Sequence, residues 1–325
     1  MIERPTILVT PHFVVRPDQL ERLGSVHQRV VVRFAQTPEE FGEVLPDADA
    51  VVTGFKMTEE LLAAAPRLRW LQVQSAGVER VLTPALAASP VTITATKGPM
   101  DVPMAEHVVT LMLALARDLP GFFRDQTNQQ WRRYPAQRGP LLEVRGRTIL
   151  VAGVGGVGGA VARMCKAGFQ MRVLGLARTR REHPYVDAFV DRERLAEALG
   201  EADFISLTLP ATPETRHFVD ERFLALMKPT SYLINIARGN LVDEAALVKA
   251  LESGGIAGAG LDAFAAEPLD PRSPLWRMPN VIITPHTSAI TDRLGDHFVD
   301  FWAENIRRFA EGEPLLGLVD KAAGY

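Results

Sequence analysis

The sequence predicts an α/β protein with two doubly wound parallel-sheet domains. Its 325 residues correspond to about two domains at roughly 150 residues each. Short β-branched runs that are apolar throughout alternate with amphipathic stretches, and this alternation occurs in two successive series. Apolar strands separated by helices are typical of a parallel sheet that helices cover on both faces. Each series therefore indicates one such sheet.

Strands and helices are expected in regular alternation along both series. In the first series, the apolar runs predict strands at residues 6–10, 30–34, 50–53, 70–74 and 91–94. Helical periodicity between them predicts helices at 17–24, 38–45, 58–65 and 79–88. The second series predicts strands at 148–152, 171–176, 202–208, 231–236, 257–261 and 281–284, again with helical segments in the gaps.

Two longer helical patterns link and end these series. The first runs from about residue 102 to 131 and is apolar through Ala116, which indicates a buried helix that could bridge the two domains. The second runs from about residue 292 to 311. We expect it to cross back onto the first series. The first domain would then comprise residues 1–101 and 292–325, and the second domain residues 102–291.

Composition and charge exclude several classes of function. Lys and Arg number 36 against 39 Asp and Glu, so the net charge of −3 gives no global attraction for nucleic acid or an anionic membrane. The single cysteine, Cys165, forms neither an internal disulfide nor a multi-thiolate site, and no His, Asp or Glu cluster has metal-ligand spacing. No signal peptide is apparent, and the longest apolar stretches fall short of the roughly 18 residues of a membrane span. We therefore expect a soluble cytoplasmic protein without a metal site.

A glycine-rich loop follows the strand expected at residues 148–152. Gly153, Gly155 and Gly158 fit the pattern G-x-G-x-x-G. In such a loop the first glycine makes the tight turn, the second lets the backbone approach a pyrophosphate, and the third lets helix and strand pack closely. The pyrophosphate lies on the free N–H groups of the following helix. A purely structural turn is the alternative, but the strand–loop–helix context favours a dinucleotide site.

The end of the next strand distinguishes NADP from NAD. An NAD site expects an acidic residue there, about 20 residues after the glycine loop, to bind the ribose 2′-hydroxyl. This chain instead has Ala177 followed by Arg178, Thr179 and Arg180, and the first carboxylate after the strand is Glu182. These residues could bind a 2′-phosphate through charge-assisted hydrogen bonds, although a solvated basic loop is the alternative. We expect NADP(H) to be preferred, with NAD(H) use still possible.

Three charged residues follow three expected strands of the second series. Arg238 comes after the strand at 231–236, Glu267 lies in the loop after 257–261, and His286 follows 281–284. The carboxyl ends of parallel strands meet at one edge of a sheet, where ligands bind, so these residues should lie beside the cofactor. Taken singly, each has a plain alternative: a solvated turn, a loop end before a proline, and an ordinary histidine.

Together the three residue types suit the reduction of a 2-keto acid. His286 can donate a proton to the carbonyl oxygen near neutral pH. Glu267, bonded to the other ring nitrogen, would fix the tautomer and favour the imidazolium. Arg238 can bind the substrate carboxylate and polarise the carbonyl, because its fork matches a pair of oxygens. The small-residue loop at 74–78 offers backbone donors for the same carboxylate.

These motifs resemble those of the D-isomer-specific 2-hydroxyacid dehydrogenases along essentially the whole chain. The resemblance rests on Ala76-Gly77-Val78, Met-Ala-Glu-His at 104–107, the glycine loop, Leu209-Pro210, Asn-Ile-Ala-Arg-Gly at 235–239, Leu-Asp-Ala-Phe at 261–264, Glu-Pro-Leu at 267–269 and Thr-Pro-His at 284–286. Within the family the chain is most similar to the A branch of NADPH-dependent glyoxylate/hydroxypyruvate reductases, through the Arg178 region, residues 273–277 and residues 319–325.

The resemblance implies a flavodoxin-like substrate domain and a Rossmann cofactor domain around a cleft, and a homodimer formed through the cofactor domains. It implies substrate binding by Arg238, support of the histidine by Glu267 and acid–base catalysis by His286, with Ala76 and Gly77 at the substrate carboxylate. The cofactor residues that it implies are Gly153, Gly155, Gly156, Val157, Gly158, Arg178, Thr179, Arg180, Leu209, Pro210, Ala237, Asp262, His286 and Ser288. Trp131 falls in the family's dimer-contact arm, where it either approaches the partner's cleft or packs as an ordinary interface residue.

The expected function is NADPH-dependent reduction of small 2-keto acids, such as glyoxylate and hydroxypyruvate, to D-2-hydroxy acids, with His286 as the proton donor. One alternative is a dehydrogenase of a larger or phosphorylated D-2-hydroxy acid. Another is a non-catalytic, nucleotide-sensing binding protein on the same fold. The intact set of arginine, glutamate and histidine favours the enzyme.

Overall fold

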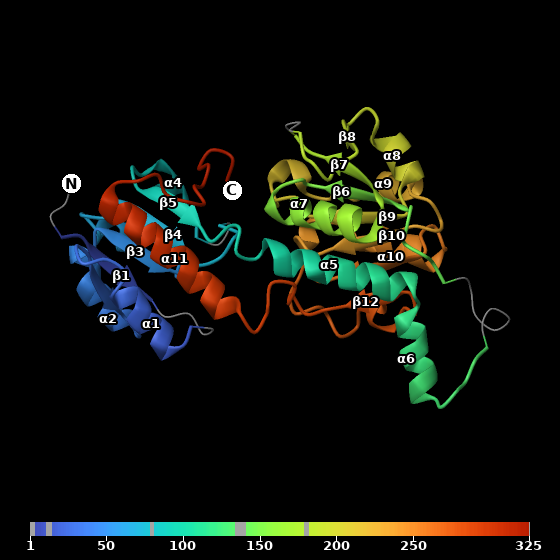
Figure 1. Cartoon of the computed structure of the whole chain (residues 1–325), viewed down its shortest axis with the longest axis horizontal. Coiled ribbons are helices and arrows are strands. Elements are labelled where there is room, and N and C mark those ends of the chain that lie inside the picture. The colour runs from blue at the N-terminus through green and yellow to red at the C-terminus, as the bar shows by residue number, and fades with distance from the viewer. Residues whose placement is uncertain (1–3, 11–14, 79–80, 134–140, 179–181, 325) are drawn as a thin grey trace. The chain divides into compact units, whose positions relative to one another are not determined.

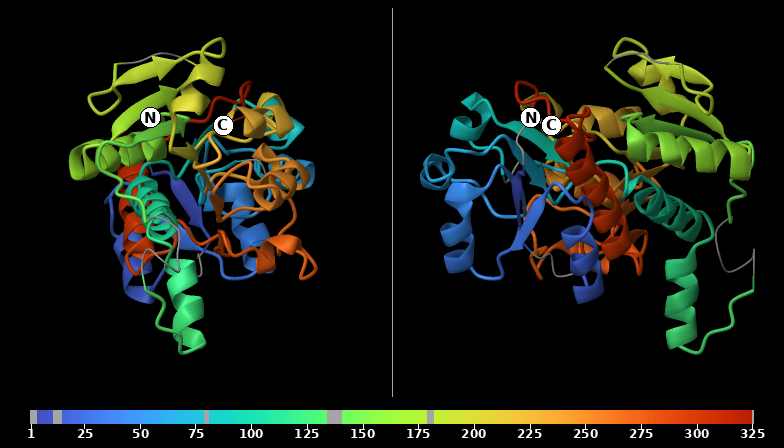
Figure 2. Two further views of the ribbon diagram at one scale, coloured as in Figure 1. Left: turned by 90° about the vertical axis from the view of Figure 1, so that its right-hand side faces the viewer. Right: turned by 60° about the vertical axis from the view of Figure 1, so that its left-hand side comes forward.

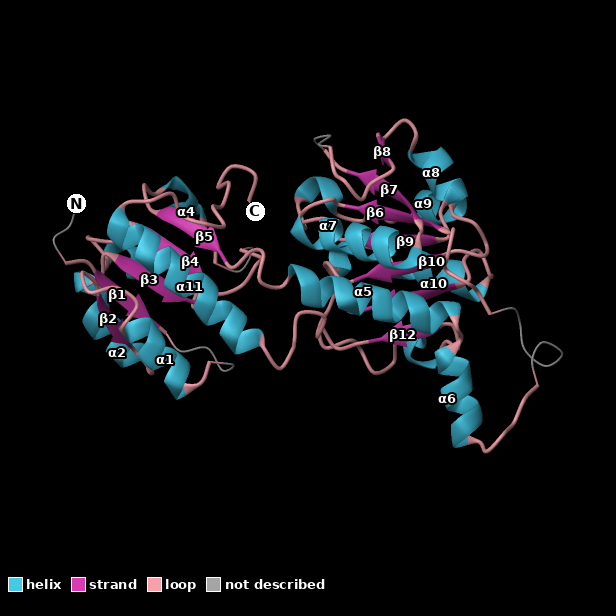
Figure 3. Cartoon of the chain, in the orientation of Figure 1, coloured by secondary structure: helices cyan, strands magenta, loops and turns pink. Residues whose placement is uncertain are grey.

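The computed structural model describes residues 4–10, 15–78, 81–133, 141–178 and 182–324. The chain divides into two compact units, Met1–Met100 with Thr291–Tyr325, and Asp101–Ile290. Each unit is an α/β domain built on its own parallel sheet, as Figures 1 and 3 show. The predicted fold class of two parallel-sheet α/β domains is confirmed. Within the described ranges, no helix combines the length and the apolar composition needed to cross a bilayer.

The first unit has a five-stranded parallel sheet with the order β2-β1-β3-β4-β5. Its strands are β1 (Thr6–Val9), β2 (Val31–Phe34), β3 (Ala50–Thr53), β4 (Trp70–Val73) and β5 (Thr92–Ala95). This order is that of flavodoxin-like doubly wound sheets. Leu8, Val51, Leu71 and Ile93 lie opposite one another across four strands and belong to one buried core. The row of apolar side chains sets the register, because a slip of one residue would turn them to the other face.

Helices cover this sheet. They are α1 (Pro17–Gly24), α2 (Pro38–Val44), α3 (Glu59–Ala63), α4 (Pro84–Ala88) and α11 (Leu294–Glu311). Three of them begin directly after a threonine whose hydroxyl accepts a backbone N–H of the first turn: Thr37 at 3.2 Å, Thr58 at 3.3 Å and Thr83 at 3.2 Å. These caps satisfy donors that have no partner inside the helix, and they fix where each helix starts.

The C-terminal helix α11 belongs to the first unit because buried polar side chains attach it to the sheet. Trp302 Nε1 donates to Thr96 Oγ1 at 3.0 Å, and Asn305 Nδ2 donates to Gln72 Oε1 at 2.9 Å. Both residues of α11 are fully buried. Beyond the helix, the chain pairs antiparallel with β5, since Val319 N donates to Ile93 O at 2.9 Å. The N-terminal and C-terminal segments thus share one core.

The second unit has a seven-stranded parallel sheet with the order β12-β11-β10-β9-β6-β7-β8. Its strands are β6 (Thr148–Ala152), β7 (Arg172–Leu176), β8 (Ala188–Val190), β9 (Phe204–Leu207), β10 (Tyr232–Asn235), β11 (Gly258–Leu261) and β12 (Val281–Ile283). The chain starts in the middle at β6, builds outward to β8, and then returns to β9 on the other side. This is the order of a Rossmann sheet with one added strand, and its topological switch point lies between β6 and β9.

The second sheet carries a hydrophobic core on each face. One face is covered by α5 (Asp101–Ala116) and α7 (Gly156–Arg163), which lie side by side in Figures 1 and 2. The other face is covered by α8 (Leu195–Glu201), α9 (Glu221–Leu226) and α10 (Glu244–Glu252). Burial on both faces explains why the strands of this sheet are apolar throughout.

Three elements differ from those expected. The helix expected at 102–131 is two helices, α5 and α6 (Leu119–Thr127), and α6 extends away from the sheet of its unit (Figure 2). Asp118 separates the two helices, because it has the left-handed φ of +50°. Its side chain caps α6 by accepting the Gly121 N–H at 3.1 Å, and Pro120 lies in the first turn of that helix. Strand β8 was not expected. Of the helix expected at 79–88, residues 79 and 80 lie outside the described residues, and helix α4 begins at Pro84.

Candidate active site

The glycine loop joins β6 to α7, and its glycines meet distinct steric demands. Gly153 has φ +103°, and a Cβ there would lie 2.7 Å from the carbonyl of Thr208. A Cβ on Gly158 would lie 1.9 Å from the carbonyl oxygen of Gly153, so only a glycine lets α7 pack this close to the strand. Beside Gly155, in contrast, nothing lies within 4 Å of the Cβ position. That space leaves the backbone accessible to a ligand.

The loop fits a dinucleotide pyrophosphate. Gly156 and Val157 form the start of α7, so their N–H groups have no partner within the helix and point out of its positive end. Across the switch point, Thr208 Oγ1 donates to the Gly153 carbonyl at 2.6 Å and holds the loop against the end of β9. Leu209 and Pro210 follow Thr208 at the same edge of the sheet. Sequence analysis missed Thr208; a hydroxyl residue directly after an apolar strand is the signal that could have identified it.

The segment after β7 is the expected site of cofactor discrimination. Arg178 is exposed there, whereas Thr179 and Arg180 lie outside the described residues. The pKa of Glu214 is lowered, chiefly by a hydrogen bond from Thr212 and also by the charge of Arg178. Arg178 is therefore close enough to Glu214 for their charges to interact. In the sequence, no acidic residue lies between the end of β7 at Leu176 and Glu182.

His286 and Glu267 form a hydrogen-bonded pair. His286 Nδ1 lies 2.8 Å from Glu267 Oε2 and 3.0 Å from Oε1, and Oε1 also accepts the Phe264 N–H at 3.0 Å. An ionised carboxylate only accepts, so Nδ1 carries the proton in this contact. The His286 side chain is 46% exposed, and among the described residues nothing bonds its Nε2 atom. Nε2 is therefore available to a ligand.

A buried carboxylate holds the turn that carries His286. His286 has φ +54°, a left-handed conformation that costs about 1–2 kcal/mol for a side chain other than glycine. Its N–H donates to the Asp262 carbonyl at 3.0 Å. The Asp262 carboxylate accepts the N–H groups of Thr287 and Ser288, each at 2.9 Å, and the Thr284 hydroxyl at 2.6 Å. Asp262 and Ser288 thus have structural contacts here, and the cofactor role expected of them stays a prediction.

Arg238 lies in the turn that follows β10, the strand that neighbours β11. The Asn235 side chain donates to the Arg238 carbonyl at 3.0 Å and accepts the Ala237 N–H at 3.1 Å, which shapes this turn. A Cβ on Gly239 would lie 1.8 Å from the backbone of Phe264, so the turn packs directly on the loop that leads to Glu267. Because β10, β11 and β12 are parallel neighbours, the turns of Arg238, Glu267 and His286 leave the same edge of the sheet.

The predicted substrate-binding residues Ala76 and Gly77 lie in the first unit, directly after β4. The loop is stabilised by Ser75, whose hydroxyl donates to the Gly77 carbonyl at 2.6 Å and whose own carbonyl accepts the Thr96 N–H at 3.0 Å. Ala76 is exposed and Gly77 is half-buried. Their backbone groups thus stand at the carboxyl edge of the five-stranded sheet, where a doubly wound fold binds its ligands.

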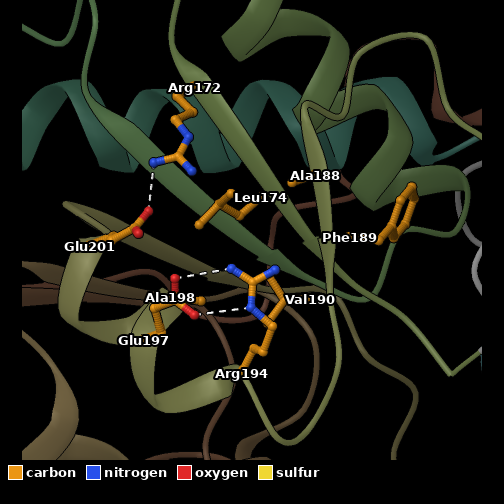
Figure 4. A pocket seen from close by; sticks show the side chains of 9 residues that line it. All are labelled: Arg172, Leu174, Ala188, Phe189, Val190, Arg194, Glu197, Ala198 and Glu201. Carbon is orange, nitrogen blue, oxygen red and sulfur yellow. Dashed lines mark hydrogen bonds and ion pairs between the residues drawn. The ribbon is translucent and has the colours of Figure 1, made fainter.

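A hollow at the β7–β8 edge, shown in Figure 4, is a poor candidate for a ligand site. Its volume is about 30 Å³, room for about one water molecule. Its rim is closed by two ion pairs, Arg172 with Glu201 and Arg194 with Glu197. Within the described ranges, no group of three or more His, Cys, Asp or Glu side chains is arranged to hold a metal ion.

Comparisons with known proteins agree with this geometry. The NAD binding domain of the D-isomer specific 2-hydroxyacid dehydrogenases matches residues 109–288. A glyoxylate reductase of Pyrococcus furiosus is 35% identical over 289 residues, 87% of this chain and 85% of that protein. The dehydrogenase of Xanthobacter autotrophicus Py2, crystallised with NADPH and MES, is 32% identical with a TM-score of 0.84, over 98% of this chain and 99% of that one.

A second solved structure extends this likeness. The NADPH-dependent glyoxylate/hydroxypyruvate reductase of Sinorhizobium meliloti, in complex with NADP and sulfate, is 30% identical with a TM-score of 0.82, over 99% of this chain and all of that one. The resemblance identified from the sequence motifs is confirmed. The chain belongs to the D-isomer specific 2-hydroxyacid dehydrogenase family and is an NAD(P)-dependent oxidoreductase.

Proposed function

We propose that this chain reduces small 2-keto acids, with glyoxylate and hydroxypyruvate as the first candidates, to D-2-hydroxy acids with NADPH. The observation that carries the proposal is the His286–Glu267 pair, which stands at the carboxyl edge of the sheet that bears the glycine loop. The names of two similar proteins support the substrate class, because both are glyoxylate reductases by name. Two similar structures contain NADPH or NADP, which supports the cofactor.

The three charged residues divide the chemistry among them. NADPH, when bound, supplies the hydride that the carbonyl carbon receives. The guanidinium of Arg238 binds the substrate carboxylate and stabilises negative charge as it develops on the carbonyl oxygen. The substrate is thereby oriented before any bond changes.

His286 supplies the proton in this proposal. Glu267 accepts from Nδ1, so the second proton of the imidazolium is on Nε2, the atom that is open to a ligand. As the carbonyl oxygen gains charge, Nε2 gives this proton to it and the neutral imidazole keeps its Nδ1–H bond to Glu267. In the opposite direction the same nitrogen accepts the proton of the hydroxy acid.

Replacement of His286 tests this assignment. His286→Ala should lower kcat about 10²–10⁴-fold, because the proton donor acts in the transition state, while the Kd for NADPH changes little. Arg238→Ala should lower kcat/KM through both binding and polarisation. Initial rates followed by NADPH absorbance, with glyoxylate, hydroxypyruvate and larger or phosphorylated 2-keto acids, provide the measurement. His297→Ala, a histidine of α11, is the matched control. Turnover of the His286 variant near that of the wild type would contradict the mechanism.

Arg178 provides the test of cofactor choice. We expect a higher kcat/KM with NADPH than with NADH. Arg178→Ala should reduce the kcat/KM for NADPH by about tenfold and leave that for NADH nearly unchanged, because NADH lacks the 2′-phosphate that the guanidinium would bind. Steady-state rates over a range of both cofactors measure the two ratios. Equal use of NADH by the unaltered protein would overturn NADPH preference without affecting the assignment of His286.

Asp101 places an unexpected negative charge beside the glycine loop. A Cβ built on Gly156 would lie 1.9 Å from Asp101 Oδ2, so the carboxylate fills the space next to the first turn of α7. Burial raises the pKa of Asp101 from 3.8 to about 6. At neutral pH the carboxylate is ionised. Its partial burial then lowers the stability of the folded protein, and its charge repels an anionic pyrophosphate.

Substitution of Asp101 should therefore have a pH-dependent effect. The folded protein binds the Asp101 proton more tightly than the unfolded chain does. The loss of folding stability caused by the ionised carboxylate is therefore complete above pH 6 and disappears as the pH falls toward about 4. Asp101→Asn should raise the free energy of unfolding by about 1 kcal/mol at pH 8, after allowance for solvent screening, and should tighten NADPH binding. Urea unfolding and binding titrations at several pH values measure both effects. Glu106→Gln, an exposed carboxylate of the same helix, is the control, and weaker NADPH binding by Asp101→Asn would refute the repulsion.

We further propose that the chain forms a homodimer through the region of α6. Phe123 is 61% exposed and Trp131 is 91% exposed, and two further apolar residues of α6, Leu119 and Phe122, are exposed as well. Several exposed apolar side chains on one segment indicate an interaction surface. The double substitution Phe123→Ser with Trp131→Ser should convert a dimer to a monomer, because it removes apolar surface that the partner would cover. Light scattering after size exclusion measures the mass. Trp276→Ser, at an exposed tryptophan elsewhere in the unit, should remain dimeric, and a monomeric unaltered protein would refute the proposal.

A further inference from the structure

We propose that His107 is a positioning residue, which acts through Thr284 and Asp262 on the turn that carries His286. His107 lies on α5, on the face of the sheet where α5 packs, and its sequence motif has no role in the proposed reaction. Its Nε2 atom lies 3.0 Å from Thr284 Oγ1 and 3.7 Å from Asp262 Oδ1. This inference rests on the proposed function in one respect: the turn matters for catalysis because it carries the proposed proton donor His286.

Hydrogen-bond geometry fixes the direction of each contact. Thr284 Oγ1 lies 2.6 Å from the Asp262 carboxylate, which can only accept, so the hydroxyl hydrogen points at Asp262. The same hydroxyl oxygen must then accept from His107, which places a hydrogen on His107 Nε2. The chain of donors runs from His107 to Thr284 to Asp262, and it ends on the carboxylate that binds the Thr287 and Ser288 N–H groups.

The turn needs these contacts because it is not an intrinsically favourable conformation. His286 adopts φ +54° at its centre. The two N–H groups that follow His286 both point to the Asp262 carboxylate, and Asp262 is fully buried. A buried carboxylate is stable only when donors surround it. The Thr284 hydroxyl is one of those donors, and His107 orients it.

Close packing of α5 brings His107 within reach of the turn. A Cβ on Gly260 of β11 would lie 3.0 Å from Leu111 Cβ, so the missing side chain of Gly260 lets α5 lie directly on the strand. Leu111 is one turn of α5 beyond His107, and Asp262 directly follows β11. The mostly buried imidazole of His107 thereby connects a helix packed on the core to the turn at the sheet edge.

Two substitutions at His107 separate positioning from general packing. His107→Leu removes the donor, whereas His107→Gln retains an N–H that can reach Thr284. In the protein without ligands, we expect the amide hydrogens of Thr287 and Ser288 to exchange about tenfold faster in His107→Leu and at nearly the unaltered rate in His107→Gln. In turnover, His107→Leu should lower kcat about tenfold with little change in the KM for NADPH, and His107→Gln should restore most of kcat.

Further variants complete the test. Thr110→Val, about one turn further along α5, removes a hydroxyl that donates to the Glu106 carbonyl at 2.8 Å, and it should change neither exchange nor kcat. Thr284→Val should act like His107→Leu, and the double variant should be no worse than either single one, because both belong to one chain of contacts. Reduced thermal stability of His107→Leu with unchanged exchange at Thr287 and Ser288 would overturn the proposal.

The exchange measurement also separates this inference from the proposed function. If His107→Leu accelerates exchange at the turn but no 2-keto acid is reduced by the unaltered protein, the positioning role stands and the proposed substrate class fails. If 2-keto acids are reduced and neither exchange nor kcat responds to His107→Leu, the positioning role fails and the proposed function stands.

Discussion

The parallel alignment of β10, β11 and β12 is the constraint on which the candidate site depends. Each strand is followed by a turn that carries a polar side chain of the proposed site, and the shared strand direction places all three turns at one edge of the sheet. The glycine loop leaves the same sheet at its switch point, beside the end of β9. A single sheet therefore supplies both the dinucleotide loop and the groups proposed for catalysis, and a hydrophobic core covers each of its faces.

Buried polar groups fix the parts of the molecule that apolar packing alone would leave imprecise. Hydrogen bonds to the Asp262 carboxylate stabilise the left-handed turn at His286, and the hydrogen bond from Thr208 holds the glycine loop against the end of β9. In the first unit, Asn305 and Trp302 attach α11 to the sheet in the same manner. A buried polar group without a hydrogen-bond partner costs free energy, so each of these groups favours the arrangement of its neighbours that supplies one. Apolar contacts supply the bulk of the stability, and these hydrogen bonds select the geometry.

Much of the fold could be predicted because its signals are local. The apolar β-branched runs and the caps at Thr37, Thr58 and Thr83 depend on neighbouring residues alone. The errors came where local patterns competed. The apolar run of α5 continues into α6, and the break at Asp118 shows only as an aspartate before Leu-Pro. Strand β8 is three residues long, too short for a periodic pattern to distinguish it from a loop.

For the site, the sequence by itself determined which residue types are present and that Arg238, Glu267 and His286 follow apolar strands. It also specified the glycine loop, because the need for a missing Cβ at Gly153 and Gly158 is a property of the motif. Only the tertiary structure decided which side chains touch: that Glu267 meets Nδ1 of His286, that Asp262 is buried under the turn, and that His107 reaches Thr284 from α5. Such contacts join residues up to 177 positions apart in the chain. They arise from the packing of helices on the sheet, which no local spacing encodes.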